Sequence, residues 1–315
     1  MSRYLVTGGA GFIGSHIVEA LAQQGEDVRV LDNFCSGSRA NLAPWLSRIE
    51  LVEGDIRDEA MVRRMMQGVN YVLHQAALRS VPKSLSDPAG YHDVNVTGTL
   101  TLLRAAAEAK VKRFVVASSS SVYGDTQRLP EREEDTPAPI SPYAATKLAD
   151  ELYLQLFTRA YDLPTVALRY FNVYGPRQSL ESEYAVVVPK FIICLLQGQP
   201  TPFHGDGLQS RDFTFVTDVV QANLRACTAK HASGEAFNVA GGESHSIQEL
   251  AGTLNRILGT NIPPKIGPVR PGDVLHTRAD ISKAERLLGW KPAVSFEDGL
   301  RRTVDAYRQA TAGVR

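Results

Sequence analysis

Tyr143 and Lys147 lie four residues apart in a segment, Ser141–Tyr161, whose pattern predicts a helix. Residues at this spacing project from the same face of a helix. An ordinary tyrosine has a pKa of about 10 and is a weak base at neutral pH, but a neighbouring ammonium stabilises its phenolate. Lowering the pKa of a phenol by ~3 units requires about 4 kcal/mol. The pair can therefore transfer protons, although the same spacing is common on ordinary helix surfaces.

A run of four hydroxyls, Ser118, Ser119, Ser120 and Ser121, ends a predicted strand over Phe114–Ser118. Open α/β sheets bind ligands at the carboxyl ends of their parallel strands. A serine in this position can hydrogen-bond to a sugar hydroxyl or to a developing ketone. Some of the four can be ordinary turn residues. Together with the tyrosine and lysine, the run indicates a catalytic site at the edge of a sheet.

Three glycines, Gly8, Gly11 and Gly14, follow the predicted strand Tyr4–Thr7 and open the predicted helix Gly11–Gln24. Glycines at such positions allow a tight turn, close approach of the backbone to a pyrophosphate and close packing of the helix. The helix N-terminus offers N–H groups and the positive end of its dipole to phosphate oxygens. The first two glycines are separated by two residues, whereas the commonest dinucleotide-binding pattern has one. The segment nevertheless predicts a dinucleotide site.

Asp32 ends the second predicted strand. A carboxylate there can accept hydrogen bonds from the adenosine ribose and repels a 2′-phosphate, which favours NAD over NADP. Arg39 lies nearby and favours the opposite choice, and Asp32 can also simply cap a turn before Asn33. Asp55 and Ile56 follow the third predicted strand and suit a contact to the adenine ring, but Asp55 can equally be a turn residue.

The first half of the chain alternates short apolar runs with helical patterns, which predicts a doubly wound parallel α/β sheet of the Rossmann type. The expected strands are Tyr4–Thr7, Val28–Asp32, Ile49–Glu53, Tyr71–His74, Phe114–Ser118 and Val166–Tyr170. The expected helices are Gly11–Gln24, Glu59–Met66, Val94–Ala109 and Ser141–Tyr161. Beyond about Val173, Pro and Gly become frequent, and helix starts at Ser246, Asp280 and Ser295 predict a smaller C-terminal α/β domain.

Composition narrows the function classes. In these 315 residues Lys and Arg balance Asp and Glu at a formal net charge of +0, which argues against nucleic acid as the main partner. Cys35, Cys194 and Cys227 lie far apart, which fits a reducing compartment without disulfides, and the seven histidines show no metal-ligand spacing. No signal-peptide pattern and no bilayer-length apolar run are present, so a cytoplasmic protein without a membrane partner is expected.

Several motifs occur in order with ordinary gaps. They are the glycine segment, the serine run with Val122-Tyr123-Gly124, the Tyr-x-x-x-Lys pair, the segments 169–177 (RYFNVYGPR) and 210–213 (SRDF), and Arg270-Pro271-Gly272-Asp273. With these motifs the whole chain resembles the UDP-glucose 4-epimerase family of extended short-chain dehydrogenases/reductases, including its members that accept UDP-N-acetylglucosamine. The resemblance implies NAD as cofactor, a UDP-sugar as substrate and a homodimer packed through the helices Val94–Ala109 and Ser141–Tyr161.

The resemblance also implies roles for single residues: Ser119 is the catalytic serine, Tyr143 the base, and Lys147 the partner of the base and of the nicotinamide ribose. From the motifs and the resemblance together, the candidate cofactor contacts are Gly8, Gly11, Phe12, Ile13, Gly14, Asp32, Asn33, Asp55, Ile56, Gln75, Ala76, Ala77, Asn95, Tyr143, Lys147 and Phe171. Gln75 stands where a hydrophobic residue is usual, so its role stays open.

The candidate substrate contacts are Ser119, Ser120, Ser121, Tyr143, Asn172, Thr201, Phe203, Arg211, Arg270, Asp273 and Thr277. In the resemblance Asn172 binds the diphosphate, and Arg211 and Arg270 clamp it, since guanidinium forks fit phosphate oxygens. Asp273 would accept from the uridine ribose, and the segment 201–203 would flank uracil. Thr277 falls where the family varies between a bulky tyrosine and small residues. A small residue leaves room for an N-acetyl group, so UDP-N-acetylglucosamine as well as UDP-glucose is expected.

The residues after Ser119 favour one reaction. Related 4,6-dehydratases carry an Asp-Glu pair after the catalytic hydroxyl residue, and sugar-acid decarboxylases carry a glutamate there. Ser120 and Ser121 occupy those positions here, so a 4-keto sugar formed by NAD can only be reduced again. NAD-dependent epimerisation at C4 of a UDP-hexose is therefore expected.

Two rival functions stay open. One is a dehydratase, decarboxylase or oxidoreductase on the same scaffold, which would release dehydrated or oxidised sugar. The other is a non-catalytic dinucleotide-sensing or scaffold protein, against which the intact catalytic residues speak. We expect residues 1–172 to form the NAD-binding domain, with a return segment near 214–243, and residues 173–213 and 244–315 to form the substrate domain.

Overall fold

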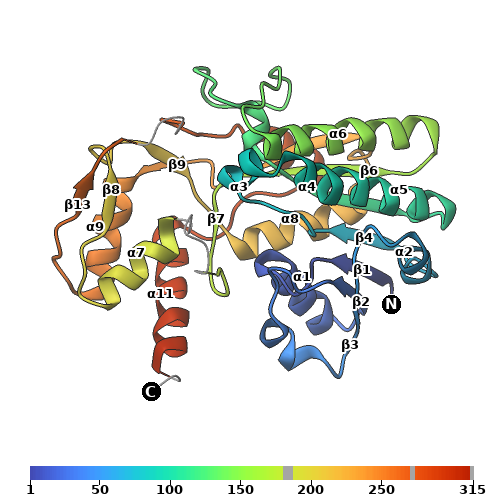
Figure 1. Cartoon of the computed structure of the whole chain (residues 1–315), viewed down its shortest axis with the longest axis horizontal. Helices are drawn as coiled ribbons and strands as arrows, with labels where there is room; N and C mark the ends of the chain where they lie inside the picture. The colour runs from blue at the N-terminus through green and yellow to red at the C-terminus, as the bar shows by residue number, and fades with distance from the viewer. Residues whose placement is uncertain (180–186, 270–273, 313–315) are drawn as a thin grey trace.

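A seven-stranded parallel sheet forms the centre of the larger part of the molecule (Figure 1). The computed structural model describes residues 1–179, 187–269 and 274–312. The strands follow the order β11-β6-β5-β4-β1-β2-β3. Their bounds are β1 Arg3–Thr7, β2 Asp27–Asp32, β3 Ile49–Glu53, β4 Tyr71–His74, β5 Arg113–Ser119, β6 Thr165–Tyr170 and β11 Glu235–Val239. The prediction of a doubly wound α/β fold is confirmed, with the six predicted strands placed within one residue at each end. β11, which was not predicted, adds to the sheet beside β6.

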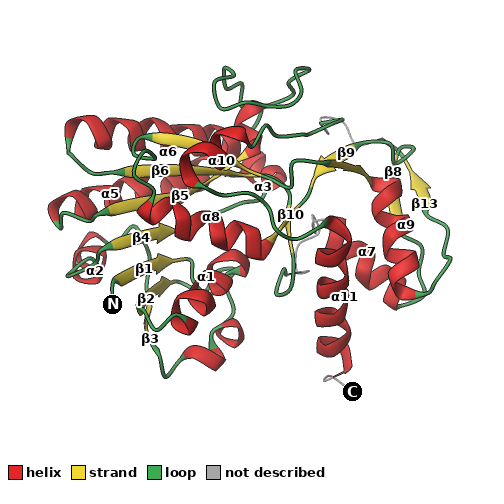
Figure 2. Ribbon diagram, turned by 180° about the vertical axis from the view of Figure 1, so that it is seen from behind, coloured by secondary structure: helices red, strands yellow, loops and turns green. Residues whose placement is uncertain are grey.

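Helices cover both faces of the sheet, as Figure 2 shows from behind. One face packs on α1 (Phe12–Gln23), α8 (Val216–Thr228) and α10 (Ser282–Leu288). The other face packs on α2 (Glu59–Met65), α5 (Gly98–Glu108) and α6 (Pro142–Ala160). Successive strand residues enter opposite cores: Val6 lies in the first and Leu5 in the second. The central strands are largely apolar because both of their faces are buried, whereas the edge strand β3 is only partly covered.

The predicted helix Val94–Ala109 differs in its first turn. Residues Asp93–Thr97 are π-helical, and the regular helix α5 begins only at Gly98. Two short helices, α3 (Val81–Ser86) and α4 (Pro88–His92), precede this turn and were not predicted. Insertions of this kind are rare and occur frequently at functional sites. The π-helical turn contains the buried Asn95.

The rest of the chain builds small sheets and a separate apolar core. The strands pair as β10-β7, β12-β9 and β13-β8. Their bounds are β7 Val173–Tyr174, β8 Pro202–His204, β9 Ser210–Asp212, β10 Thr214–Phe215, β12 Ser244–Ser246 and β13 Lys265–Gly267. The helices of this part are α7 Val187–Leu196, α9 Ile247–Leu258 and α11 Phe296–Ala312. Ser246 and Glu249 form the predicted capping box of α9.

The described helices include none with both the length and the apolar character of a membrane crossing. The domain bounds expected from the sequence stay a prediction.

Candidate active site

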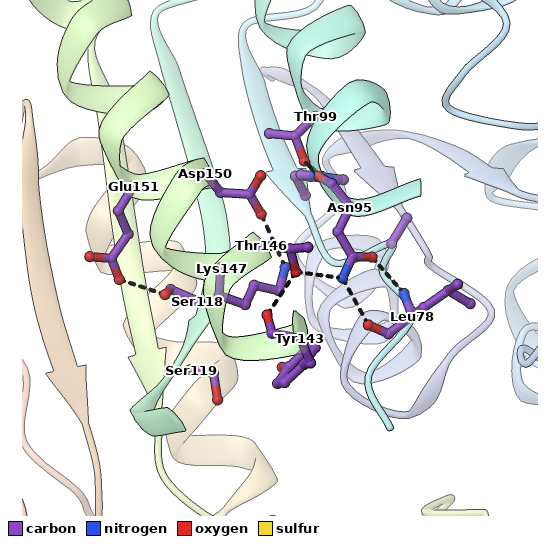
Figure 3. Close-up of polar contacts among 12 residues, drawn as sticks. Leu78, Asn95, Thr99, Ser118, Ser119, Tyr143, Thr146, Lys147, Asp150 and Glu151 are labelled. Carbon is purple, nitrogen blue, oxygen red and sulfur yellow. Dashed lines mark hydrogen bonds and ion pairs between the residues drawn. The ribbon is translucent and has the colours of Figure 1, made fainter. Parts of the chain in front are cut away.

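Tyr143, Lys147 and Ser119 come together where β5 ends and α6 begins (Figure 3). Ser141 caps α6, because its side chain accepts a hydrogen bond from the Ala144 backbone N–H. Tyr143 thus lies in the first turn of the helix and is partly exposed, whereas Lys147, one turn later, is 3% exposed. The helix start therefore keeps the phenol accessible and withdraws the ammonium from water.

The hydroxyl of Ser119 is oriented by Ser121. The Ser119 Oγ accepts hydrogen bonds from the backbone nitrogen of Ser121, at 3.2 Å, and from the Ser121 Oγ, at 2.8 Å. A serine hydroxyl has one proton and two acceptor lone pairs. With both acceptor sites engaged, the Ser119 proton is left to be donated to a ligand. Ser120 and Ser121 are partly exposed beside it, whereas Ser118 is buried and donates to Glu151 at 2.5 Å.

Asn95 ties the start of α6 to the chain after β4. Its amide oxygen accepts from the Leu78 nitrogen at 2.8 Å, and its amide nitrogen donates to the Leu78 oxygen at 2.9 Å. The same nitrogen donates to the Thr146 Oγ1 at 3.0 Å, and Thr146 in turn donates to the Tyr143 carbonyl at 2.7 Å. Asn95 is buried and positions backbone here, and its contact to the cofactor stays a prediction.

The glycine segment leaves no space for side chains. A Cβ at Gly8 would lie 2.6 Å from the Ala76 nitrogen, and one at Gly14 would lie 2.1 Å from the Gly8 oxygen. Gly8 also has φ +67°, a conformation that favours glycine. We call this turn, from Gly8 to Gly14, the glycine cradle. Helix α1 begins after Gly11, and no side chain caps it, so the N–H groups of its first turn stay available to a ligand in the cradle. These features fit a dinucleotide diphosphate.

Asp32 is held at the far end of this cradle. Its Oδ2 accepts from the Ala10 nitrogen at 2.9 Å and its Oδ1 from the Phe34 nitrogen at 2.8 Å. A carboxylate retains further acceptor sites beyond two such bonds. Arg39 lies over the Phe34 ring, 4.1 Å from its centroid, and is paired with Glu53. The arginine is therefore already engaged by a carboxylate, which supports the preference for NAD at this end.

The predicted adenine contacts lie in an ion-paired turn. Asp55 accepts from Arg57 and, at 3.1 Å, from the Asn33 amide. The hydrogen bonds from Arg57 lower the pKa of the Asp55 carboxyl to about 2. Ile56 is buried against α5, and a Cβ at Gly98 would lie 2.5 Å from it.

Gln75 joins a buried polar group. Its side chain donates to Asn223 at 3.1 Å and accepts from the Tyr170 hydroxyl at 3.2 Å. Its backbone nitrogen donates to the Thr7 carbonyl, which holds this segment beside the end of β1. Ala76 and Ala77, which follow, are partly exposed. A polar residue is therefore accommodated where a hydrophobic one is usual, because α8 supplies Asn223 as its hydrogen-bond partner.

At the proposed substrate end, residues far apart in sequence meet. The Asn172 amide lies 3.4 Å from the Thr277 Oγ1, which also accepts from the Asp212 nitrogen at 3.2 Å. The Arg211 guanidinium donates to the carbonyls of Ser210 and Leu275. The predicted contacts Arg270 and Asp273 fall outside the described residues.

Three predicted contacts have buried side chains. Thr201 and Phe203 are 0% and 2% exposed, and Phe203 stacks on Phe191 at 5.8 Å between centroids. Phe171 is 0% exposed and packs with Tyr123. A ligand would meet these segments through the backbone. Phe12 and Ile13, by contrast, are partly exposed at the start of α1.

Comparison with known proteins identifies the family. The model of the NAD dependent epimerase/dehydratase family matches residues 4–240. The chain belongs to this family. It is 40% identical over 310 residues to UDP-glucose 4-epimerase of Mycolicibacterium smegmatis, covering 97% of this chain and 98% of that one. NAD is thus the family's cofactor, and the glycine cradle and Asp32 fit it.

Two solved structures share the whole fold. UDP-N-acetylglucosamine 4-epimerase from Methanobrevibacter ruminantium, in complex with UDP-N-acetylmuramic acid, matches at TM-score 0.94 and 40% identity over 98% of this chain and 99% of that chain. UDP-glucuronic acid 4-epimerase from Bacillus cereus, with UDP-glucuronic acid and NAD, matches at TM-score 0.90 and 34% identity over 98% and 99%. Proteins of closely similar fold thus bind UDP-sugars that differ in their sugar part.

Sequence reasoning missed the buried polar residues behind the pair. His74 bonds to Thr7 at 2.6 Å and to Thr99 at 2.9 Å, and Asp150 lies 3.4 Å from Lys147. Asp150 could have been found from its spacing, because residues three apart share a helix face. His74 and Thr99 come from different elements and gave no local signal. Within residues 1–179, 187–269 and 274–312, no group of three His, Cys, Asp or Glu side chains could hold a metal ion.

Proposed function

We propose that this protein is an NAD-dependent UDP-hexose 4-epimerase, acting on UDP-glucose and UDP-galactose and on their N-acetylated counterparts. The observation that carries the proposal is the arrangement of Ser119 beside Tyr143 and Lys147. Both residues that follow Ser119 are hydroxyls, and Ser121 supplies the two bonds that orient it. Of the two neighbouring carboxylates on α6, Glu151 is engaged by Ser118 and Arg169. Asp150 lies 3.4 Å from Lys147.

The chain's own groups account for the proton movements. Tyr143, as phenolate, accepts the proton of the C4 hydroxyl, while Ser119 donates a hydrogen bond to the same oxygen. Lys147 stabilises the phenolate by its charge. When bound, NAD would supply the hydride acceptor for the sugar C4 and the hydride that reduces the keto sugar again. Ser120 and Ser121 stand where the related dehydratases and decarboxylases carry an added acid, which favours reduction of the keto sugar over loss of water or carbon dioxide.

Inversion requires the sugar to present its other face to the cofactor. The nucleotide part must stay bound while the hexose turns about its linkage to the diphosphate. Asn172 and Arg211, with Arg270, are the residues proposed to hold that diphosphate. Arg211 is suited to this because its guanidinium is anchored by two carbonyls at 2.9 and 3.2 Å.

The proposed tolerance of an N-acetyl group rests on Thr277. This small residue lies beside Asn172, and its hydroxyl is engaged by two neighbours. Similarity to an epimerase named for UDP-N-acetylglucosamine supports the extension to acetylated sugars.

The decisive experiment incubates the purified protein with UDP-glucose and, separately, with UDP-N-acetylglucosamine, and identifies the products by nuclear magnetic resonance. We expect the C4 epimers, with no net NADH. Tyr143→Phe should reduce turnover by roughly 10²- to 10⁴-fold, the usual contribution of a general acid or base. Dehydrated product would identify a dehydratase, accumulating NADH an oxidoreductase, and undiminished Tyr143→Phe turnover would rule out this mechanism.

We also propose a cytoplasmic homodimer built through α5 and α6. Helix α6 and the residue after it carry exposed apolar side chains at Leu152, Leu156 and Tyr161, with exposures of 60%, 48% and 57%. A second copy of the chain would cover them. The three free cysteines fit a reducing compartment.

A further inference from the structure

A carboxylate lies fully buried behind the proposed catalytic pair. Asp150 is on α6, three residues after Lys147, and its side chain is 1% exposed. Its Oδ2 lies 3.4 Å from the Lys147 Nζ, whose own side chain is 4% exposed. Among the described residues its buried Oδ1 has no donor at an ordinary hydrogen-bond geometry, and the nearby Thr99 hydroxyl favours the ionised carboxylate. In Figure 3 Asp150 points toward Lys147 from the side away from Ser119 and the Tyr143 ring.

Among the groups around Asp150, Lys147 is the positively charged group that the Asp150 carboxylate contacts. Glu151, its neighbour on α6, is paired with Arg169 at 2.7 Å. From β4, His74 is 1% exposed, and burial together with the charge of Lys147 lowers the pKa of its imidazole to about 3. Thr99 of α5 donates its hydroxyl proton to the Asn95 carbonyl, so the His74 Nε2 donates to Thr99. His74 is therefore neutral at every pH at which the enzyme would work.

In the proposed function one ammonium thus serves two groups that can carry a negative charge: Asp150, which it contacts, and Tyr143, one helical turn before it on α6. Burial raises the pKa of the Asp150 carboxyl to about 7, against the opposing effect of the Lys147 charge. An ionised Asp150 offsets part of the positive potential of Lys147, so Lys147 stabilises a Tyr143 phenolate less strongly. Ionisation of either group then makes ionisation of the other harder.

We propose that Asp150 is a positioning residue that anchors Lys147 and offsets part of its positive potential. Asp150 and Tyr143 then jointly set the acid limb of the activity, that is, the pH range over which activity falls on acidification. The proposal rests on the function proposed above, in which Tyr143 is the base. Interacting groups lose their protons over a wider pH range than a single group does. The acid limb of the wild-type enzyme should therefore be shallower than a single-group titration.

The test compares kcat against pH for the NAD-loaded wild type, Asp150→Asn and Glu297→Gln on UDP-glucose. Glu297→Gln removes the same charge from an exposed ion pair with Arg256 on the surface, so its profile should match the wild type. Asp150→Asn should give a single-group limb whose midpoint lies about one pH unit lower, since the charge of Lys147 then acts on Tyr143 alone. A profile with wild-type midpoint and steepness, at whatever overall rate, would show that Asp150 is merely structural and overturn the proposal.

A second measurement does not require turnover. The ultraviolet difference absorbance between the NAD-loaded wild type and Tyr143→Phe reports the phenolate of Tyr143, and the same pair is made in the Asp150→Asn background. A narrower titration at lower pH in that background supports the proposal even if no UDP-hexose is epimerised, in which case only the proposed function fails. Identical titrations in both backgrounds refute it even if the enzyme is an epimerase. If Asp150→Asn does not fold, Asp150→Ser, whose smaller side chain leaves room for water, carries both comparisons.

Discussion

Single residues decide whether the dinucleotide can approach the chain. A methyl group at Gly14 would lie 2.1 Å from the Gly8 oxygen, so the turn would have to open. We expect Gly14→Ala to weaken NAD binding at least about tenfold, or ~1.4 kcal/mol, in calorimetric titration of protein stripped of nucleotide. Gly252→Ala is the matched control, because a Cβ there meets nothing within 4 Å. Unchanged affinity of Gly14→Ala would contradict this account of the cradle.

Thr277 gives a prediction about specificity at the same scale. Thr277→Tyr fills the space proposed for the N-acetyl group, so turnover of UDP-N-acetylglucosamine should fall at least about tenfold more than that of UDP-glucose. Differences of 1–3 kcal/mol are typical of pocket-size discrimination. The measurement is kcat/KM for both sugars on wild type and variant. An equal loss on the two sugars would show that Thr277 is no size gate.

At the scale of elements, α6 carries both the site and the proposed dimer surface. Its buried side holds Lys147 and Asp150, and its outer side exposes Leu152 and Leu156. Leu156→Arg places a charge in that apolar contact, so we expect a shift toward monomer in sedimentation analysis, with the fold retained. Leu46→Arg, at another leucine of similar exposure, 50%, should leave the assembly unchanged. A dimer unaffected by Leu156→Arg would place the interface elsewhere.

At the scale of the whole molecule, buried titratable groups make stability depend on pH. Burial lowers the pKa of His74 from 6.5 to about 3, so the folded state excludes a proton that the unfolded state binds below pH 6.5. Its share of stability is lost as pH falls from 6.5 toward 3, by ~1.4 kcal/mol per pH unit. Burial raises the pKa of Glu131 and Asp212 to about 7. The contribution of these two carboxyls to the stability of the fold therefore has the opposite dependence and is lost as pH rises from about 4 through 7.

The histidine contribution therefore has to be measured as a difference. We expect the free energy of unfolding of the wild type, relative to that of His74→Gln, to decline as pH is lowered from 6.5 to 5. Urea unfolding at several pH values gives this difference. A pH-independent difference would mean that His74 binds a proton equally well in both states.

The sequence by itself determined the features that depend on local periodicity and turn chemistry. It placed six strands of the sheet, because most of these strands are buried on both faces and form largely apolar runs. It placed the glycine turn before α1 and the Tyr143/Lys147 pair on one face of α6, because such spacing acts within one or two turns of chain. It also placed Asp32 at the end of β2, where its side chain accepts two backbone bonds.

Only the tertiary structure decided which distant residues meet. Asn172 and Thr277 are 105 residues apart and lie within 3.4 Å, whereas Phe203, expected near a ligand, is buried in the core of the smaller part. β4 and α5 bring His74 and Thr99 together behind Lys147. No local pattern encodes these contacts, because each depends on how separate helices and strands pack, and that packing is set by the burial of their apolar faces together.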